Sequence, residues 1–341
     1  MPIAKKTSTS STYRDVLKRA FTTIIKNKFL WFFGFFAGFL GTAGEFEPLF
    51  KNYTNIGDRA QDILSLQSIY QDGILYALYN TLELFFSAYP WQAFLFLLMF
   101  FVIFIIVVWL AIVSQIALFN SAYKLGKGKS VKFGDGYRVG NKHFGSVLLI
   151  NIIVKVFLYA VFVVIGAPLI TWFLVKNTLL GGIIFVILVF VVFIPVSIIV
   201  SFIVKYAIAY IVIKGKHAGE SVKLGWDLFK KNWLISIEMA LLILAIGLVT
   251  GLVILLGMGL TSVPFVILGM ISFFINSSAG FTIALVLGTI TWFIVLSIIG
   301  SAYIAFQYTA WTFLFVKLTE NKAESKFTRL IGKLSLKNIS K

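Results

Sequence analysis

Three ionisable side chains, Lys155, Lys205 and Glu238, stand inside apolar stretches of the sequence. Charged groups in a lipid bilayer are costly, and they mark ion or proton pathways where they pair or line a water-filled cavity. A pair between Glu238 and either lysine would be the smallest such pathway. The competing interpretation is structural: the lysines extend their stems to the headgroups, and Glu238 lies close to the interface.

Neutral polar residues in the same stretches extend this candidate polar path. Asn151 and Lys155 are four residues apart, so a helix presents them on one face. Two glutamines, one in the second and one in the sixth apolar stretch, could line the same interior. The whole candidate set is Gln115, Asn151, Lys155, Lys205, Glu238 and Gln307. If these groups converge on water, the sequence predicts a transporter, a channel or a lipid-translocating protein.

A second set of residues combines aromatic rings with cations at the ends of the apolar stretches. Tryptophan places its ring at headgroup level in a membrane, and a neighbouring cation can reach lipid phosphate. These candidate headgroup contacts are Lys26, Lys28, Trp31, Arg138, Lys142, Trp226, Lys230, Lys231 and Trp233. They predict binding of anionic lipid, or of a membrane partner, through basic helices at the cytoplasmic interface.

Enzymatic and metal chemistry find little support in the sequence. The chain has no cysteine, which excludes disulfides, thiolate metal sites and a cysteine nucleophile. Its two histidines, His143 and His217, stand in basic stretches without the spacing of a metal motif. We expect no metal, no cofactor and no catalytic residues, and an intramembrane enzyme ranks third among the functions considered.

The composition is that of a membrane protein. Apolar residues make up 60% of the chain and charged residues 13%, against about 45–50% and about 25% in globular proteins. A spanning helix needs roughly 20 apolar residues. Six spans are predicted, at residues 29–43, 91–119, 144–175, 182–204, 233–257 and 281–316. The first of them is short, and residues 264–275 suit a re-entrant or interfacial segment.

The distribution of basic residues predicts the orientation. Residues 1–28, 120–143, 214–232 and 317–341 hold seven, six, five and seven Lys or Arg, which is 25 of the chain's 30. Cytoplasmic loops carry such an excess, so both termini are expected in the cytoplasm. The net charge of +17 then reflects topology and not nucleic-acid binding. The residue usage suits a bacterial inner membrane, and the first span is expected to be retained.

The loop at residues 44–90 is predicted to lie outside the cell. It holds six of the chain's 13 acidic residues, and its apolar residues between 59 and 86 recur at helical spacing. We therefore expect one or two amphipathic helices at the outer surface.

An internal repeat organises the chain into three hairpins. An offset of 89 residues places Gly136 on Gly225, Lys142 on Lys231 and Phe144 on Trp233 without a gap. The predicted single membrane domain, residues 1–341, therefore contains parallel repeats at about 13–133, 134–216 and 217–325, followed by a basic cytoplasmic tail at 326–341. A helix over residues 137–175 would be about 58 Å long. We therefore expect residues 137–145 and 226–234 to form interfacial helices, with a bend before each span.

Two glycine pairs indicate close helix packing. Gly34 and Gly38, and likewise Gly247 and Gly251, are four residues apart. Small residues at this spacing let the backbones of two membrane helices approach. Packing within one chain is the favoured interpretation of both pairs.

The segments at residues 221–233, 123–128 and 310–315 resemble a loose superfamily of bacterial multi-pass proteins. That superfamily includes the membrane domain of some glycerophosphodiester phosphodiesterases and several uncharacterised inner-membrane families. The resemblance covers nearly the whole chain and implies a six-helix membrane domain. The chain has no room for the soluble catalytic barrel, which needs roughly 250 residues. The leading hypothesis is a non-enzymatic membrane protein that binds anionic lipid or a membrane partner.

Overall fold

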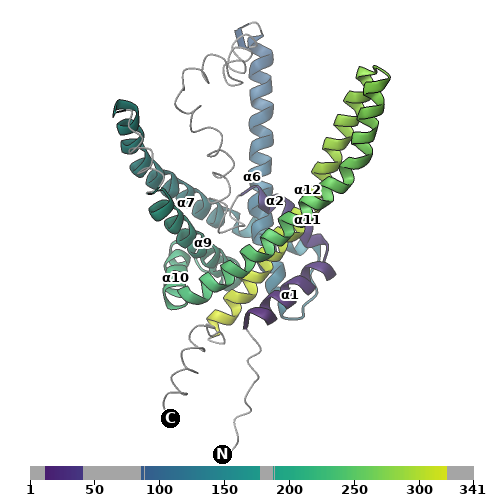
Figure 1. Ribbon diagram of the computed structural model, residues 1–341. Helices are drawn as coiled ribbons and strands as arrows, with labels where there is room; N and C mark the ends of the chain where they lie inside the picture. Colours follow the sequence, from purple (N-terminus) through teal and green to yellow (C-terminus); the bar gives the residue numbers. More distant parts are fainter. Residues whose placement is uncertain (1–11, 41–85, 88, 177–186, 188, 321–341) are drawn as a thin grey trace, which may run out of the picture.

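The fold is a set of long helices that converge at one end and separate towards the other (Figure 1). It is seen in a computed structural model, which describes residues 12–40, 86–87, 89–176, 187 and 189–320. No strand occurs among these residues. The predicted loop at 44–90, apart from its last few residues, and the tail at 326–341 lie outside them.

Among the described residues, five helices are long and apolar enough to cross a membrane. The chain is therefore a multi-pass membrane protein, helical throughout its described part except for short turns. The five helices include α6 (Pro90–Gly126), α7 (Phe133–Lys176) and α9 (Ile194–Lys214), the last preceded by the π-helix η3 (Val189–Phe193). The other two are α11 (Trp233–Phe274) and α12 (Ser278–Thr319). The first predicted span appears as α2 (Phe29–Gly38), which has 10 residues and is too short for a crossing on its own.

Two amphipathic helices precede apolar helices at the converging end. They are α1 (Thr12–Lys26), which leads into α2, and α10 (Ala218–Lys231), which leads into α11. The chain breaks between each pair at an asparagine whose side-chain amide donates to the carbonyl four residues earlier. Asn27 donates to Thr23 at 2.9 Å, and Asn232 donates to Leu228 at 3.0 Å. Such side-chain bonds compete with the helical ladder and favour a helix end.

The expected break after residue 145 is absent. Helix α7 runs unbroken over 44 residues, so residues 137–145 are its beginning and not a separate interfacial helix. No asparagine stands where a break would match the other two, because His143 occupies that place. Gly136 and Gly140 also hold this first part of α7 against α6: a Cβ at Gly140 would lie 2.9 Å from the Val113 carbonyl oxygen.

Residues 264–275 are not a separate re-entrant segment either. They continue α11, which passes through Pro264 and forms a hairpin with α12. Both helices have 42 residues, which corresponds to a length of about 63 Å. The hairpin is thus about twice as long as the hydrocarbon layer is thick, about 30 Å.

The buried core lies at the converging end, which we call the base. It contains residues 111–122 of α6, 194–212 of α9, 235–243 of α11 and 301–318 of α12, although not every residue in these ranges is buried. Helix α2 packs between α12 and α6, and α1 packs along α12. Beyond the base the helices diverge: residues 94–106 of α6 are all exposed, and the outer part of the α11–α12 hairpin forms a separate arm (Figure 1).

Close backbone contact at glycine holds the base together. A Cβ added to Gly34 of α2 would lie 2.1 Å from the Ser301 carbonyl oxygen of α12. One added to Gly225 of α10 would lie 2.9 Å from the Ile203 carbonyl oxygen of α9. In the pairs predicted from sequence, Gly38 meets Ile304 and Gly247 meets Tyr303, whereas Gly251 faces open space.

The Gly34 contact predicts opposite effects of one substitution at two glycines. Gly34→Ala should lower the melting temperature of the purified protein, because overpacking costs about 1–3 kcal/mol and the Ser301 backbone cannot rotate away. Gly145→Ala is the matched control, since no atom lies within 4 Å of its Cβ position. It should leave stability unchanged or raise it by up to about 1 kcal/mol. Equal melting temperatures for wild type and Gly34→Ala would contradict the contact.

Candidate functional site

A chain of buried polar groups crosses the base. Asn151 of α7 donates its side-chain amide to the Gln115 side-chain oxygen at 3.1 Å. Gln115 of α6 in turn donates to the Tyr308 hydroxyl of α12 at 3.1 Å. All three side chains are buried. The structure therefore brings together two residues of the predicted polar path, and it adds Tyr308, which the sequence did not single out.

Lys205 of α9 is buried beside an aromatic ring. Only 2% of the residue is exposed, and its Nζ donates to the Ser201 hydroxyl at 3.1 Å. The same Nζ lies 5.4 Å from the ring centroid of Trp311 on α12. A cation over an aromatic face is attracted by the ring quadrupole, and this attraction grows when water is absent. Lys205 thus faces the interior of the base and does not extend to the surface.

The other members of the predicted path are placed differently. Gln307 is buried in the base, and its Oε1 has no hydrogen-bond partner. Lys155 is exposed, although it stands one helical turn after the buried Asn151. The reason is the divergence of the helices, because residues 152–164 of α7 include no buried residue. Shared spacing on a helix face therefore did not bring Lys155 into the core.

Glu238 of α11 is held by the N-terminal helix. The Tyr13 hydroxyl of α1 donates to Glu238 Oε2, and Glu238 is half-buried. The sequence suggested Lys155 or Lys205 as its partner. The Tyr13 contact joins residues 225 positions apart, and no local pattern around either residue indicated it.

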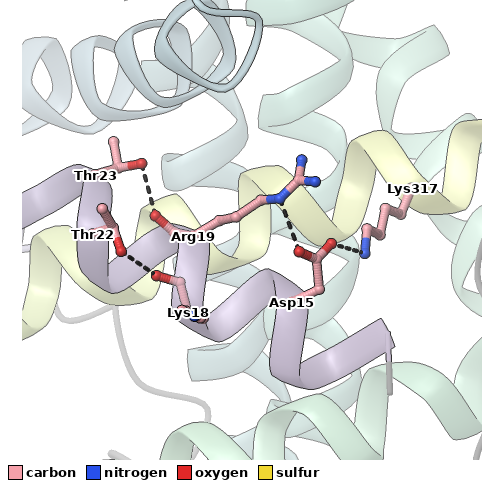
Figure 2. A network of polar contacts seen from close by, with 6 residues as sticks. All are labelled: Asp15, Lys18, Arg19, Thr22, Thr23 and Lys317. Carbon is pink, nitrogen blue, oxygen red and sulfur yellow. Dashed lines mark hydrogen bonds and ion pairs between the residues drawn. The ribbon is translucent and has the colours of Figure 1, made fainter. Parts of the chain in front are cut away.

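A second polar contact fastens α1 to α12 (Figure 2). Lys317 Nζ lies 2.6 Å from Asp15 Oδ2, and Arg19 Nε lies 2.9 Å from Asp15 Oδ1. Partial burial alone would raise the pKa of the Asp15 carboxyl. The hydrogen bond and charge of Lys317, together with those of Arg19, outweigh that effect and hold the pKa below its ordinary value of 3.8.

The apolar face of α1 completes its docking. Tyr13, Val16, Ala20 and Ile24 are buried, and their spacing of three to four residues defines one side of a helix. The exposed residues on the rest of its surface include Arg14, Lys18, Phe21, Ile25 and Lys26. The helix is therefore docked on one side and open on the other.

The candidate headgroup contacts lie on the outside of the base. Eight of the nine residues are exposed: Lys26, Lys28, Arg138, Lys142, Trp226, Lys230, Lys231 and Trp233. Trp31 is half-buried and donates its ring N–H to the Ile24 carbonyl at 3.1 Å. On α10, Lys230 lies over the Trp226 ring at 5.5 Å from its centroid and 3.3 Å from Asp227.

Within the described part of the chain, no group of three or more His, Asp or Glu side chains is arranged to hold a metal ion. Comparison of the chain with known protein families, with curated proteins and with solved structures gives no match. The resemblance to a membrane superfamily therefore stays a prediction from the sequence.

The Asp15 contact predicts a pH-dependent stability. A carboxyl whose pKa is lowered on folding stabilises the protein above its unfolded pKa, and this contribution disappears as the pH falls through the folded pKa. The melting temperature of wild type should exceed that of Asp15→Asn at about pH 7, and the two should converge towards about pH 2.

The matched control is Thr22→Val, which removes a hydroxyl bonded to the Lys18 carbonyl of its own helix at 2.9 Å. The difference in melting temperature between Thr22→Val and wild type should not change with pH. A difference between wild type and Asp15→Asn that stays constant down to about pH 2 would contradict the role of the ion pair.

Proposed function

We propose that this is a non-enzymatic membrane protein that binds anionic lipid headgroups through three basic, aromatic surface segments around the base. The segments are α1, the first part of α7 at residues 133–145, and α10. We propose further that they begin three equivalent hairpins, at about residues 13–133, 134–216 and 217–325, which make up one membrane domain with both termini in the cytoplasm.

The observation that carries this proposal is one arrangement that occurs three times. A small buried residue is followed directly by an exposed aromatic residue, in the pairs Ala20–Phe21, Gly136–Tyr137 and Gly225–Trp226. The aromatic side chains are 57%, 38% and 41% exposed. Five residues after each aromatic stands an exposed lysine, at Lys26, Lys142 and Lys231. An exposed ring with a nearby cation is the composition expected at the headgroup level of a membrane.

Each segment lies against a different spanning helix. Helix α1 packs on α12, the first part of α7 packs on α6, and α10 packs on α9. The small residue makes the approach possible: a Cβ at Gly136 would lie 3.1 Å from Ala117 Cβ, and one at Gly225 would lie 3.1 Å from the Ala207 nitrogen. The three segments therefore rest on three different spanning helices of the base.

The charge distribution supports a cytoplasmic position for this surface. The stretches of the chain that hold 25 of the 30 Lys and Arg residues include all three segments, and such an excess marks the cytoplasmic side. Anionic lipid in the facing leaflet attracts each exposed Lys or Arg by about 1 kcal/mol. The placement of Lys155 outside the core, and the contact of Glu238 with α1, favour this function over a continuous conducting path.

The proposal predicts the effect of removing one lysine from each segment. The variant Lys26→Gln, Lys142→Gln, Lys231→Gln should retain less phosphatidylglycerol than wild type after exchange in phosphatidylcholine–phosphatidylglycerol nanodiscs. The expected loss is about 1 kcal/mol of binding free energy per lysine, and it should shrink as salt is added. Mass spectrometry of the co-purified lipid measures it.

A control of equal charge is available in the loop between α6 and α7. Lys127→Gln, Lys129→Gln, Lys132→Gln removes three exposed lysines that belong to none of the three segments. It should retain more phosphatidylglycerol than the first variant. If the two variants retain equal amounts, net charge alone governs lipid binding, and the three-segment proposal is wrong.

A further inference from the structure

An apolar groove lies on the arm of the α11–α12 hairpin. It has a volume of about 570 Å³ and is lined by residues 262–274 of α11 and 281–292 of α12, among them Phe265, Phe281 and Trp292. The hairpin belongs to the base only through residues 235–243 and 301–318, so the groove lies towards the other end of the molecule. The groove is therefore separate from the basic segments.

Small residues facing phenyl rings give the groove its depth. Gly269, Ala284 and Gly288 are buried between the two helices. A Cβ at Gly269 would lie 3.8 Å from the Phe281 ring, and a Cβ at Gly288 would lie 3.4 Å from Phe265 Cβ. Each helix thus contributes a glycine that faces a phenylalanine of the other. These two contacts set the separation of the helices along the groove.

The lining of the groove is almost entirely apolar. Its two hydroxyl side chains bond to their own helices: Ser262 donates to the Met258 carbonyl at 2.7 Å, and Thr289 donates to the Leu285 carbonyl at 2.9 Å. No Asp, Glu, Lys, Arg or His occurs between residues 239 and 316. The absence of charge and the apolar lining therefore favour a neutral hydrocarbon occupant over a headgroup.

The position of the groove determines the source of that hydrocarbon. It belongs to a hairpin about 63 Å long whose surface on both sides is apolar, and the groove is continuous with exposed side chains such as Val266 and Met270. A long apolar hairpin is accommodated in a bilayer by tilt or by local thickening of the bilayer, which places the arm against lipid hydrocarbon. We propose that the groove binds one acyl chain of a membrane phospholipid. The residence time of this lipid in the groove exceeds that of lipid on the rest of the protein surface.

Photo-crosslinking of the full chain tests this proposal. The protein is placed in phosphatidylcholine nanodiscs that contain a phosphatidylcholine with a diazirine on one acyl chain, and the adducts are mapped by mass spectrometry after illumination. Adducts should concentrate on residues 262–274 and 281–292. Residues 94–106 of α6 are the internal reference, because they are exposed and apolar and are not part of the lining of this groove.

A substitution that fills the groove provides a second test of the proposal. Gly269→Leu should lower adduct formation on residues 281–292 about tenfold, which corresponds to the loss of about two buried methylene groups. Gly259→Leu is the matched control on the same helix, since it is exposed with no atom within 4 Å of its Cβ position. It should leave the adducts unchanged.

Two results would overturn the proposal. One is equal adduct formation on the arm and on residues 94–106 in the wild-type protein, a comparison that needs no substitution. The other is a change in adduct formation on residues 281–292 that is equally large in Gly269→Leu and in Gly259→Leu. Either result would make the groove part of the general lipid-facing surface.

Discussion

Contact between helix backbones at small residues is the interaction on which the structure depends. Apolar helices gain little by leaving lipid for one another, so a membrane bundle forms where shape lets backbones approach. Gly34 on Ser301, Gly140 on Val113 and Gly225 on Ile203 are such places, and each joins a helix of the base to a different partner. The base is where these contacts occur. Beyond it the helices diverge, as their exposed side chains show.

The polar groups of the base depend on the same contacts. Gln115, Asn151 and Tyr308 come from three helices and bond to one another only because those helices are close. Lys205 is brought over Trp311 in the same way. The ion pair of Asp15 with Lys317 and the Tyr13–Glu238 bond then attach α1 at the rim of the base. Attachment on one side leaves Phe21 and the cations of α1 exposed on the other.

Much of the fold could be predicted from the sequence because hydrophobicity is a local property. Four of the five spans predicted from residue 91 onwards lie within long helices, and α9 covers only the last part of the span predicted at 182–204. The headgroup candidates, except for the half-buried Trp31, are exposed. Predictions that required knowledge of neighbouring helices did less well. Lys155 shares a helix face with Asn151, yet it lies outside the core because α7 leaves the base between them. The break expected within α7 is missing because His143 stands where Asn27 and Asn232 end the other segments. The partner of Glu238 came from a helix 225 residues away, which no local pattern could indicate.

The depth of residues 21, 137 and 226 in the bilayer tests the three-segment arrangement most directly. Single cysteines at these positions, introduced into a chain that has none of its own, can carry spin labels whose contact with oxygen and with a water-soluble nickel complex reports depth. If the three segments are equivalent, the three labels should lie at the same headgroup level of the same leaflet. The equivalence of the three segments would be contradicted by a label at residue 137 that lies in the hydrocarbon. A label at 137 on the opposite side of the membrane from the labels at 21 and 226 would contradict it as well.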